Sequence, residues 1–140
     1  MTYDYKDGSP TRVFRVELIN IPTTITAGSM QNIGVQFPVY DAREISFAIN
    51  YVKVTDNITA LTAQALFAFS KGSAVTFVEQ KLDGDGETYS NRLISPKLVA
   101  AGGQAIFSVF PAGMPWVQLQ MNFTAATSPQ ILLATANRLL

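Results

Sequence analysis

The densest group of side chains that could take part in chemistry is the carboxylate cluster Asp83-Gly84-Asp85-Gly86-Glu87. Its Asp-x-Asp-Gly core matches the start of a calcium-binding loop, in which carboxylate oxygens surround the ion. A complete EF-hand loop also needs a bidentate Glu at its twelfth position, and this chain has Ile94 there. The EF-hand motif therefore fails. The sequence predicts a solvated hairpin loop here, with a looser, lectin-type Ca²⁺ site as the alternative.

The same cluster is a poor catalytic pair. If Asp85 and Glu87 acted as acid and base, one of them would need a dry cleft to raise its pKa, and a glycine-flanked polar loop does not supply one. The chain also contains no histidine and no cysteine, which excludes Ser-His-Asp, Cys-His and His-metal chemistry. The sequence therefore predicts a protein that is not an enzyme and that uses no cofactor and no metal.

A second candidate group surrounds Trp116, which shares one face of an alternating segment with Gln118, Gln120 and Asn122. Together with other aromatic side chains, this face could stack on a sugar ring and donate amide hydrogen bonds to its hydroxyls. Two other interpretations stay open: Trp116 packs at the end of a core, or the neutral amide face lies against another protein, where burial costs less than it does for charged groups. The other candidate aromatic residues are Tyr40, Tyr51 and Tyr89.

The charge balance limits the partners. Ten basic and ten acidic residues give a net charge of zero, so we expect no nucleic-acid partner. No apolar run is long enough to span a bilayer and the first residues lack the apolar core of a signal peptide, so we expect no membrane partner and a product made in the cytoplasm. Charged residues make up 14% of the chain, about half of the usual share. This deficit indicates either a surface covered by a partner or a Thr/Ser/Gln/Asn-rich surface.

The elements that must position these residues are β-strands. In residues 116–124, Val117, Leu119, Met121 and Phe123 fall on one face, which is the period-two pattern of a half-buried strand. Residues 131–135 are expected to return as its hairpin partner after the turn that ends at Pro129. Further strands are expected in residues 12–20, 23–29, 33–37, 44–54, 61–70, 75–78 and 105–110.

About eight or nine short strands with no long amphipathic helix predict an all-β fold, an antiparallel, jelly-roll-like β-sandwich. Residues 1–11 are expected to form an N-terminal arm and residues 12–140 a single domain. In residues 65–69, Ala65, Phe67 and Phe69 are expected to share one face, and Lys71-Gly72-Ser73 to turn the chain into the next strand. A helical turn is expected after Pro96.

Four features of the chain carry a resemblance to small bacteriophage virion proteins: a small His-free and Cys-free β-domain, its Thr/Ser/Gln/Asn decoration, a Pro-Ala-Gly-Met-Pro lead-in, and the final hairpin segment Trp-Val-Gln-Leu-Gln-Met-Asn-Phe-Thr. Among these proteins the chain most resembles the decoration or cement proteins of capsid lattices, which often have a jelly-roll or β-sandwich fold. The resemblance covers most of the chain in overall style and includes no diagnostic motif, so it assigns no site residues.

This resemblance implies a non-enzymatic virion protein on the capsid surface, which binds the major capsid protein or another virion protein as a homo-oligomer, with a trimer favoured. The alternative is a carbohydrate- or receptor-binding module of a phage tail or head fibre. The residues expected to contact the partner are Tyr3, Tyr5, Lys6, Trp116, Gln118 and Gln120.

Overall fold

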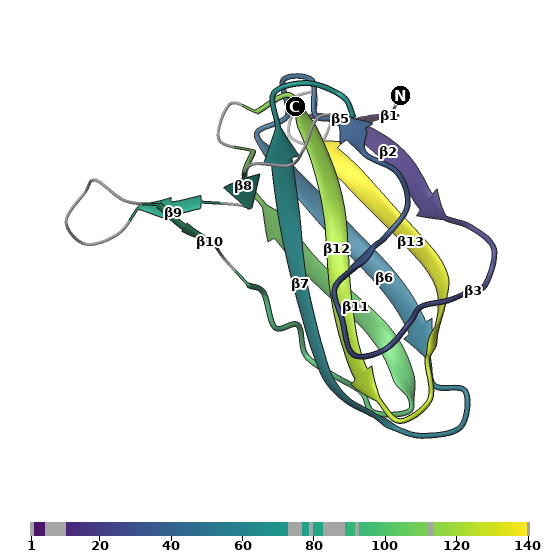
Figure 1. The fold of residues 1–140 in the computed structure, drawn as a ribbon. Coiled ribbons are helices and arrows are strands. Elements are labelled where there is room, and N and C mark those ends of the chain that lie inside the picture. Colours follow the sequence, from purple (N-terminus) through teal and green to yellow (C-terminus); the bar gives the residue numbers. More distant parts are fainter. Residues whose placement is uncertain are drawn as a thin grey trace.

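The computed structural model describes residues 2–4, 11–72, 77–78, 80–82, 89–91, 93–111 and 114–139, and this part of the chain contains strands and no helix (Figure 1). The strands are β1 (Thr2–Asp4), β2 (Thr11–Ile19), β3 (Thr23–Thr24), β4 (Gln31–Asn32), β5 (Phe37–Pro38), β6 (Glu44–Val52), β7 (Ile58–Ala68), β8 (Phe77–Val78), β9 (Gln80–Leu82), β10 (Tyr89–Asn91), β11 (Gly102–Val109), β12 (Trp116–Ala125) and β13 (Gln130–Leu139).

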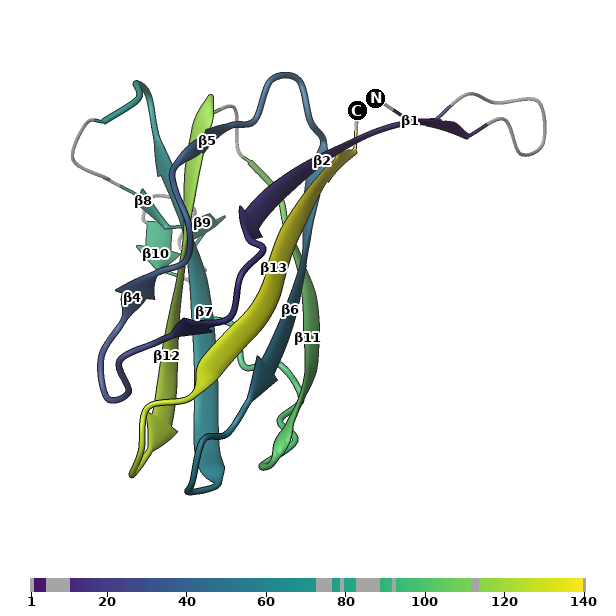
Figure 2. The same ribbon diagram turned by 90° about the vertical axis from the view of Figure 1, so that its right-hand side faces the viewer.

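The strands form two facing sheets and one separate pair. Sheet A has the order β1-β2-β13-β6-β11, with β3 also paired to β13; sheet B has the order β4-β12-β7-β8, with β5 also paired to β12. Every pairing is antiparallel. Figure 2 shows the two layers edge-on, and Figure 1 shows the β9–β10 pair standing away from them. The predicted all-β antiparallel sandwich is confirmed. The short strands of two or three residues are pairings that alternation alone does not reveal.

The core lies between the sheets and is built by alternation. Val117, Leu119, Met121 and Phe123 on β12 are all 0% exposed, as the sequence predicts. On the opposing sheet, β6 buries every second residue, from Ile45 to Tyr51. Because successive side chains of a strand point to opposite faces, each long strand supplies one row to this core.

The predicted C-terminal hairpin is wrong. β12 pairs with β4, β5 and β7 in sheet B, whereas β13 pairs with β2, β3 and β6 in sheet A. The connection after Ala125 therefore crosses from one sheet to the other, as Figure 2 shows. Both strands have an apolar face, and placing them in opposite layers lets these faces pack on each other across the core.

The single strand expected in residues 33–37 is also wrong. The chain instead pairs with β12 through two short strands, β4 and β5, and the backbone is irregular between them. Gly34 has a φ of 70°, which breaks the extended conformation there. Ile33 and Phe37 remain buried, but Val35 is 72% exposed, because the break turns its side chain away from the core.

Two local expectations near β7 are overturned. The strand ends at Ala68, so Phe69 lies beyond the ladder and is 69% exposed instead of facing the core. Residues 93–99 contain no helical turn. Ile94 exchanges two backbone hydrogen bonds of 2.8 Å with Ala63, and the Ala100 carbonyl accepts one from Ile58, so this segment lies extended along the edge of β7. The pairing of β7 with residues 77–78 is confirmed.

Candidate interaction surfaces

Three amide side chains form a ladder across the outer face of sheet B. Gln64 Nε2 donates to Gln120 Oε1 at 2.8 Å, and Gln120 Nε2 donates to Asn32 Oδ1 at 2.8 Å. The register of β12 places Gln120 opposite both partners, on β7 and on β4. We call Asn32, Gln120 and Gln64 the amide ladder. It is a neutral hydrogen-bonding surface held in a fixed orientation, and it requires no buried charge.

Gln118 lies on the same face of β12 but is only 8% exposed. Its Nε2 donates to the carbonyl oxygens of Gly34, at 3.2 Å, and of Leu119, at 3.0 Å. The side chain thus supplies a hydrogen bond to the backbone between β4 and β5, where the pairing of this segment with β12 is interrupted. Its amide is occupied within the chain, and its expected contact with a partner stays a prediction.

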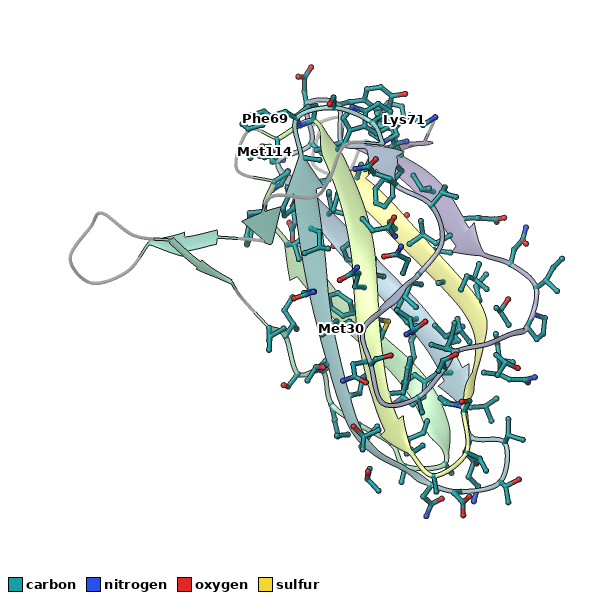
Figure 3. All side chains as sticks on the ribbon, viewed as in Figure 1. Met30, Phe69, Lys71 and Met114 are labelled. Carbon is teal, nitrogen blue, oxygen red and sulfur yellow. The ribbon has the colours of Figure 1, made fainter. Side chains whose placement is uncertain are left out.

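Trp116 starts β12 at one end of the sandwich and is partly exposed. The ammonium of Lys71 lies 5.8 Å from the centroid of its ring, within the range of a cation–π contact. Phe69, Lys71 and Met114 lie at this same end in Figure 3, whereas Met30 lies about halfway along the sandwich, next to β4. The Trp116 ring is therefore bordered by a cation, and its expected contact with a sugar or a partner stays a prediction.

Two of the aromatic residues expected beside Trp116, Tyr51 and Tyr40, make other contacts, and the side chain of the third, Tyr89, lies outside the described residues. Tyr51 is 2% exposed and belongs to the core, where its ring packs against Phe123 and its hydroxyl accepts the Val99 backbone N–H at 3.0 Å. The prediction that Tyr51 belongs to a sugar-binding platform is therefore wrong. Tyr40 is 66% exposed, but its ring contacts a different side chain, Arg138.

Arg138 is a buried cation that the sequence analysis missed. It is 8% exposed, its Nη1 donates to the Pro38 carbonyl at 2.8 Å, and its guanidinium carbon lies 4.8 Å from the centroid of the Tyr40 ring and 5.8 Å from that of the Phe14 ring. Its Nε is buried and lacks a hydrogen-bond partner in the described part of the chain. The sequence did contain a signal for the inward position of Arg138, because Ala134, Ala136 and Arg138 alternate along β13 and share the inward face.

Several expected site residues lie outside the described residues or are described by backbone alone. Tyr3 belongs to β1 and pairs with Arg12 of β2, so the start of the expected arm is an edge strand of sheet A. Tyr5, Lys6 and the Asp83-to-Glu87 cluster lie outside the described residues. The strands that flank this cluster, β9 and β10, pair with Tyr89 opposite Leu82, which agrees with the expected hairpin.

Within the described ranges, no group of three or more Asp or Glu residues is placed to hold a metal ion, and no pocket is present. This part of the chain also has no helix that could cross a membrane. No protein-family model and no curated protein matches the chain.

Proposed function

We propose that this chain is a non-enzymatic virion protein that binds a phage capsid shell and stabilises it. The observation that carries the proposal is the strand order. Taking β4 and β5 as one interrupted strand, the main strands read β2-β13-β6-β11 in sheet A and β4/β5-β12-β7-β8 in sheet B. Two four-stranded sheets connected in this order agree with a jelly roll, an architecture used by viral capsid and lectin domains.

Two surfaces support a contact with a neutral protein lattice. The β1–β2 hairpin continues beyond the last β2–β13 pair, Val13 with Leu139, and therefore projects past the end of that ladder (Figure 2). The amide ladder offers hydrogen bonds to a partner without the desolvation cost of an ion. Residues 2–4 and the amide ladder are the contacts we propose for the major capsid protein or another virion protein, with the chain acting as a homo-oligomer on the capsid surface.

Deletion of residues 1–10 is expected to lower the occupancy of the protein on capsid shells by about tenfold or more, because it removes β1 from the projecting hairpin. Occupancy is measured by co-sedimentation with shells assembled from the major capsid protein encoded in the same genome. Val54→Ser is the control, since Val54 is 56% exposed and follows β6 at the opposite end of the sandwich. Equal occupancy of the deletion and the control, with both chains folded by circular dichroism, would contradict the proposal.

The alternative function is a carbohydrate- or receptor-binding module, which the same strand order also supports because lectin domains share it. In that case, Trp116→Ala is expected to remove binding to a glycan array, since an exposed aromatic ring supplies the stacking surface. Phe69→Ala is the control, because it removes an exposed ring at the same end of the sandwich. The absence of any bound glycan for the unmodified protein would count against this alternative.

A further inference from the structure

Within the described residues, sheet A has a free edge at β11. β11 ends the strand order of this sheet, and its eight residues pair with β6 from Gly102–Val52 to Val109–Ile45 without a shift in register. An unpaired edge exposes backbone N–H and C=O groups that can pair with another strand. Proteins usually protect such edges with charge, proline, a bulge or a covering segment.

β11 has none of these protections within the described residues, whereas the other long strands do. Its sequence, Gly-Gly-Gln-Ala-Ile-Phe-Ser-Val, contains no charged residue and no proline. By contrast, the edge of β7 is covered by Ile94 and Ala100, and the edge of β12 by β4 and β5. β2 carries Arg15 and Glu17 and pairs with β1 at one end.

The side chains on the outer face of β11 are also suited to a neutral partner. Ile106 is 66% exposed and lies opposite the small residue Ala48 of β6. On the same face, Ser108 shares a 3.0 Å hydrogen bond with Ser46. Ile106 is therefore a large, exposed apolar side chain that lies next to small residues at the edge of the sheet.

We propose that two copies of this chain pair through their β11 strands, antiparallel and related by a two-fold axis, so that their A sheets become one continuous sheet. We assign the partner strand to a second copy of this chain for an electrostatic reason. A charged strand would gain no electrostatic attraction from the uncharged β11 edge, whereas two β11 strands place no like charges opposite each other. A two-fold axis also makes the contact self-complementary. With the axis near the middle of the strand, the two Ile106 side chains lie close together on the same outer face. This inference is independent of the proposed capsid function.

The test is the mass of the full chain in solution, measured by light scattering and sedimentation over a range of concentrations. We expect a dimer, and we expect Ile106→Lys to weaken dimerisation about tenfold or more, because two cations would face each other at the contact. Leu132→Lys is the matched control: Leu132 is 41% exposed, but it lies on β13, which has a partner strand on each side. A monomer at every concentration, a trimer, or equal effects of the two lysines would overturn the proposal.

A second pair of variants decides the question if Ile106→Lys does not fold. The chain contains no cysteine, so a single introduced thiol reports on one contact only. Ile106→Cys is expected to form a disulfide-linked dimer under mild oxidation, and Leu132→Cys is expected to stay largely monomeric. Equal cross-linking of both variants, or none at position 106, would show that the β11 edges do not meet.

Discussion

Phe47→Ala is expected to lower the free energy of unfolding by about 3–5 kcal/mol. Phe47 is 0% exposed and its ring lies between two others: the centroid of Phe107 is 5.3 Å away and that of Phe37 is 6.3 Å away, in an edge-on arrangement. Phe107 lies on the neighbouring strand of sheet A, whereas Phe37 lies on sheet B. The substitution therefore removes a contact between the two sheets and leaves a cavity that rigid strands cannot close.

Urea denaturation followed by tryptophan fluorescence measures this loss, with Trp116 as the single probe. Phe69→Ala removes the same atoms from a side chain that is 69% exposed, and we expect it to cost less than about 1 kcal/mol. Similar losses of unfolding free energy for the two variants would show that the Phe47 ring does not stabilise the packing of sheet A against sheet B. If the slope of the unfolding free energy against urea concentration is lower for Phe47→Ala alone, the substitution has changed the unfolded or the native ensemble.

The inward position of Phe47 could be predicted from the sequence because alternation reports which face of a strand a residue occupies. Ile45, Phe47, Ile49 and Tyr51 recur at every second position, and all of them are buried. The same signal identified the buried row of β12. The alternation of buried and exposed side chains depends only on the geometry of one strand, so it is the same whichever strands pair with it.

The partners of a strand could not be predicted in this way. β12 and β13 follow each other in the chain and both alternate, yet they belong to different sheets. Nothing in the alternation distinguishes a hairpin from a crossing between layers, because both bury the same face. The bulge of β13 between Ala134 and Thr135 in its pairing with β2 is likewise a property of two strands and not of one.

The candidate surfaces were only partly predictable for the same reason. Gln120 was expected on the outer face of its strand, but its place in the amide ladder depends on Gln64 and Asn32, which come from two other strands. Gln118 was expected on the same exposed face and is buried, because the interrupted strand containing Gly34 lies against it. A residue's face follows from its own strand, whereas its exposure depends on its neighbours.

Gly34→Ala is expected to destabilise the fold by about 2–4 kcal/mol, because two costs add. The first is conformational: Gly34 has a φ of 70°, a region that residues with a Cβ occupy at a cost of about 1–2 kcal/mol. The second is steric: an added Cβ would lie 2.7 Å from Leu18 Cβ and 2.8 Å from the Leu18 carbonyl oxygen. Part of this steric obstacle is the backbone of β2, which cannot rotate away as a side chain can. The segment between β4 and β5 that contains Gly34 therefore has to move.

Gly72→Ala separates the two costs. Gly72 has a φ of 75°, but an added Cβ would meet nothing within 4 Å, so only the conformational cost of about 1–2 kcal/mol applies. Thermal and urea unfolding of both variants give the comparison. Displacement of Gly34 should also weaken the Gln118 hydrogen bond to its carbonyl, so Gln118→Ala is expected to cost less in the Gly34→Ala background than in the unmodified chain. If Gly34→Ala and Gly72→Ala lose equal stability, the close approach to Leu18 does not constrain the fold, and the break between β4 and β5 is set by backbone conformation alone.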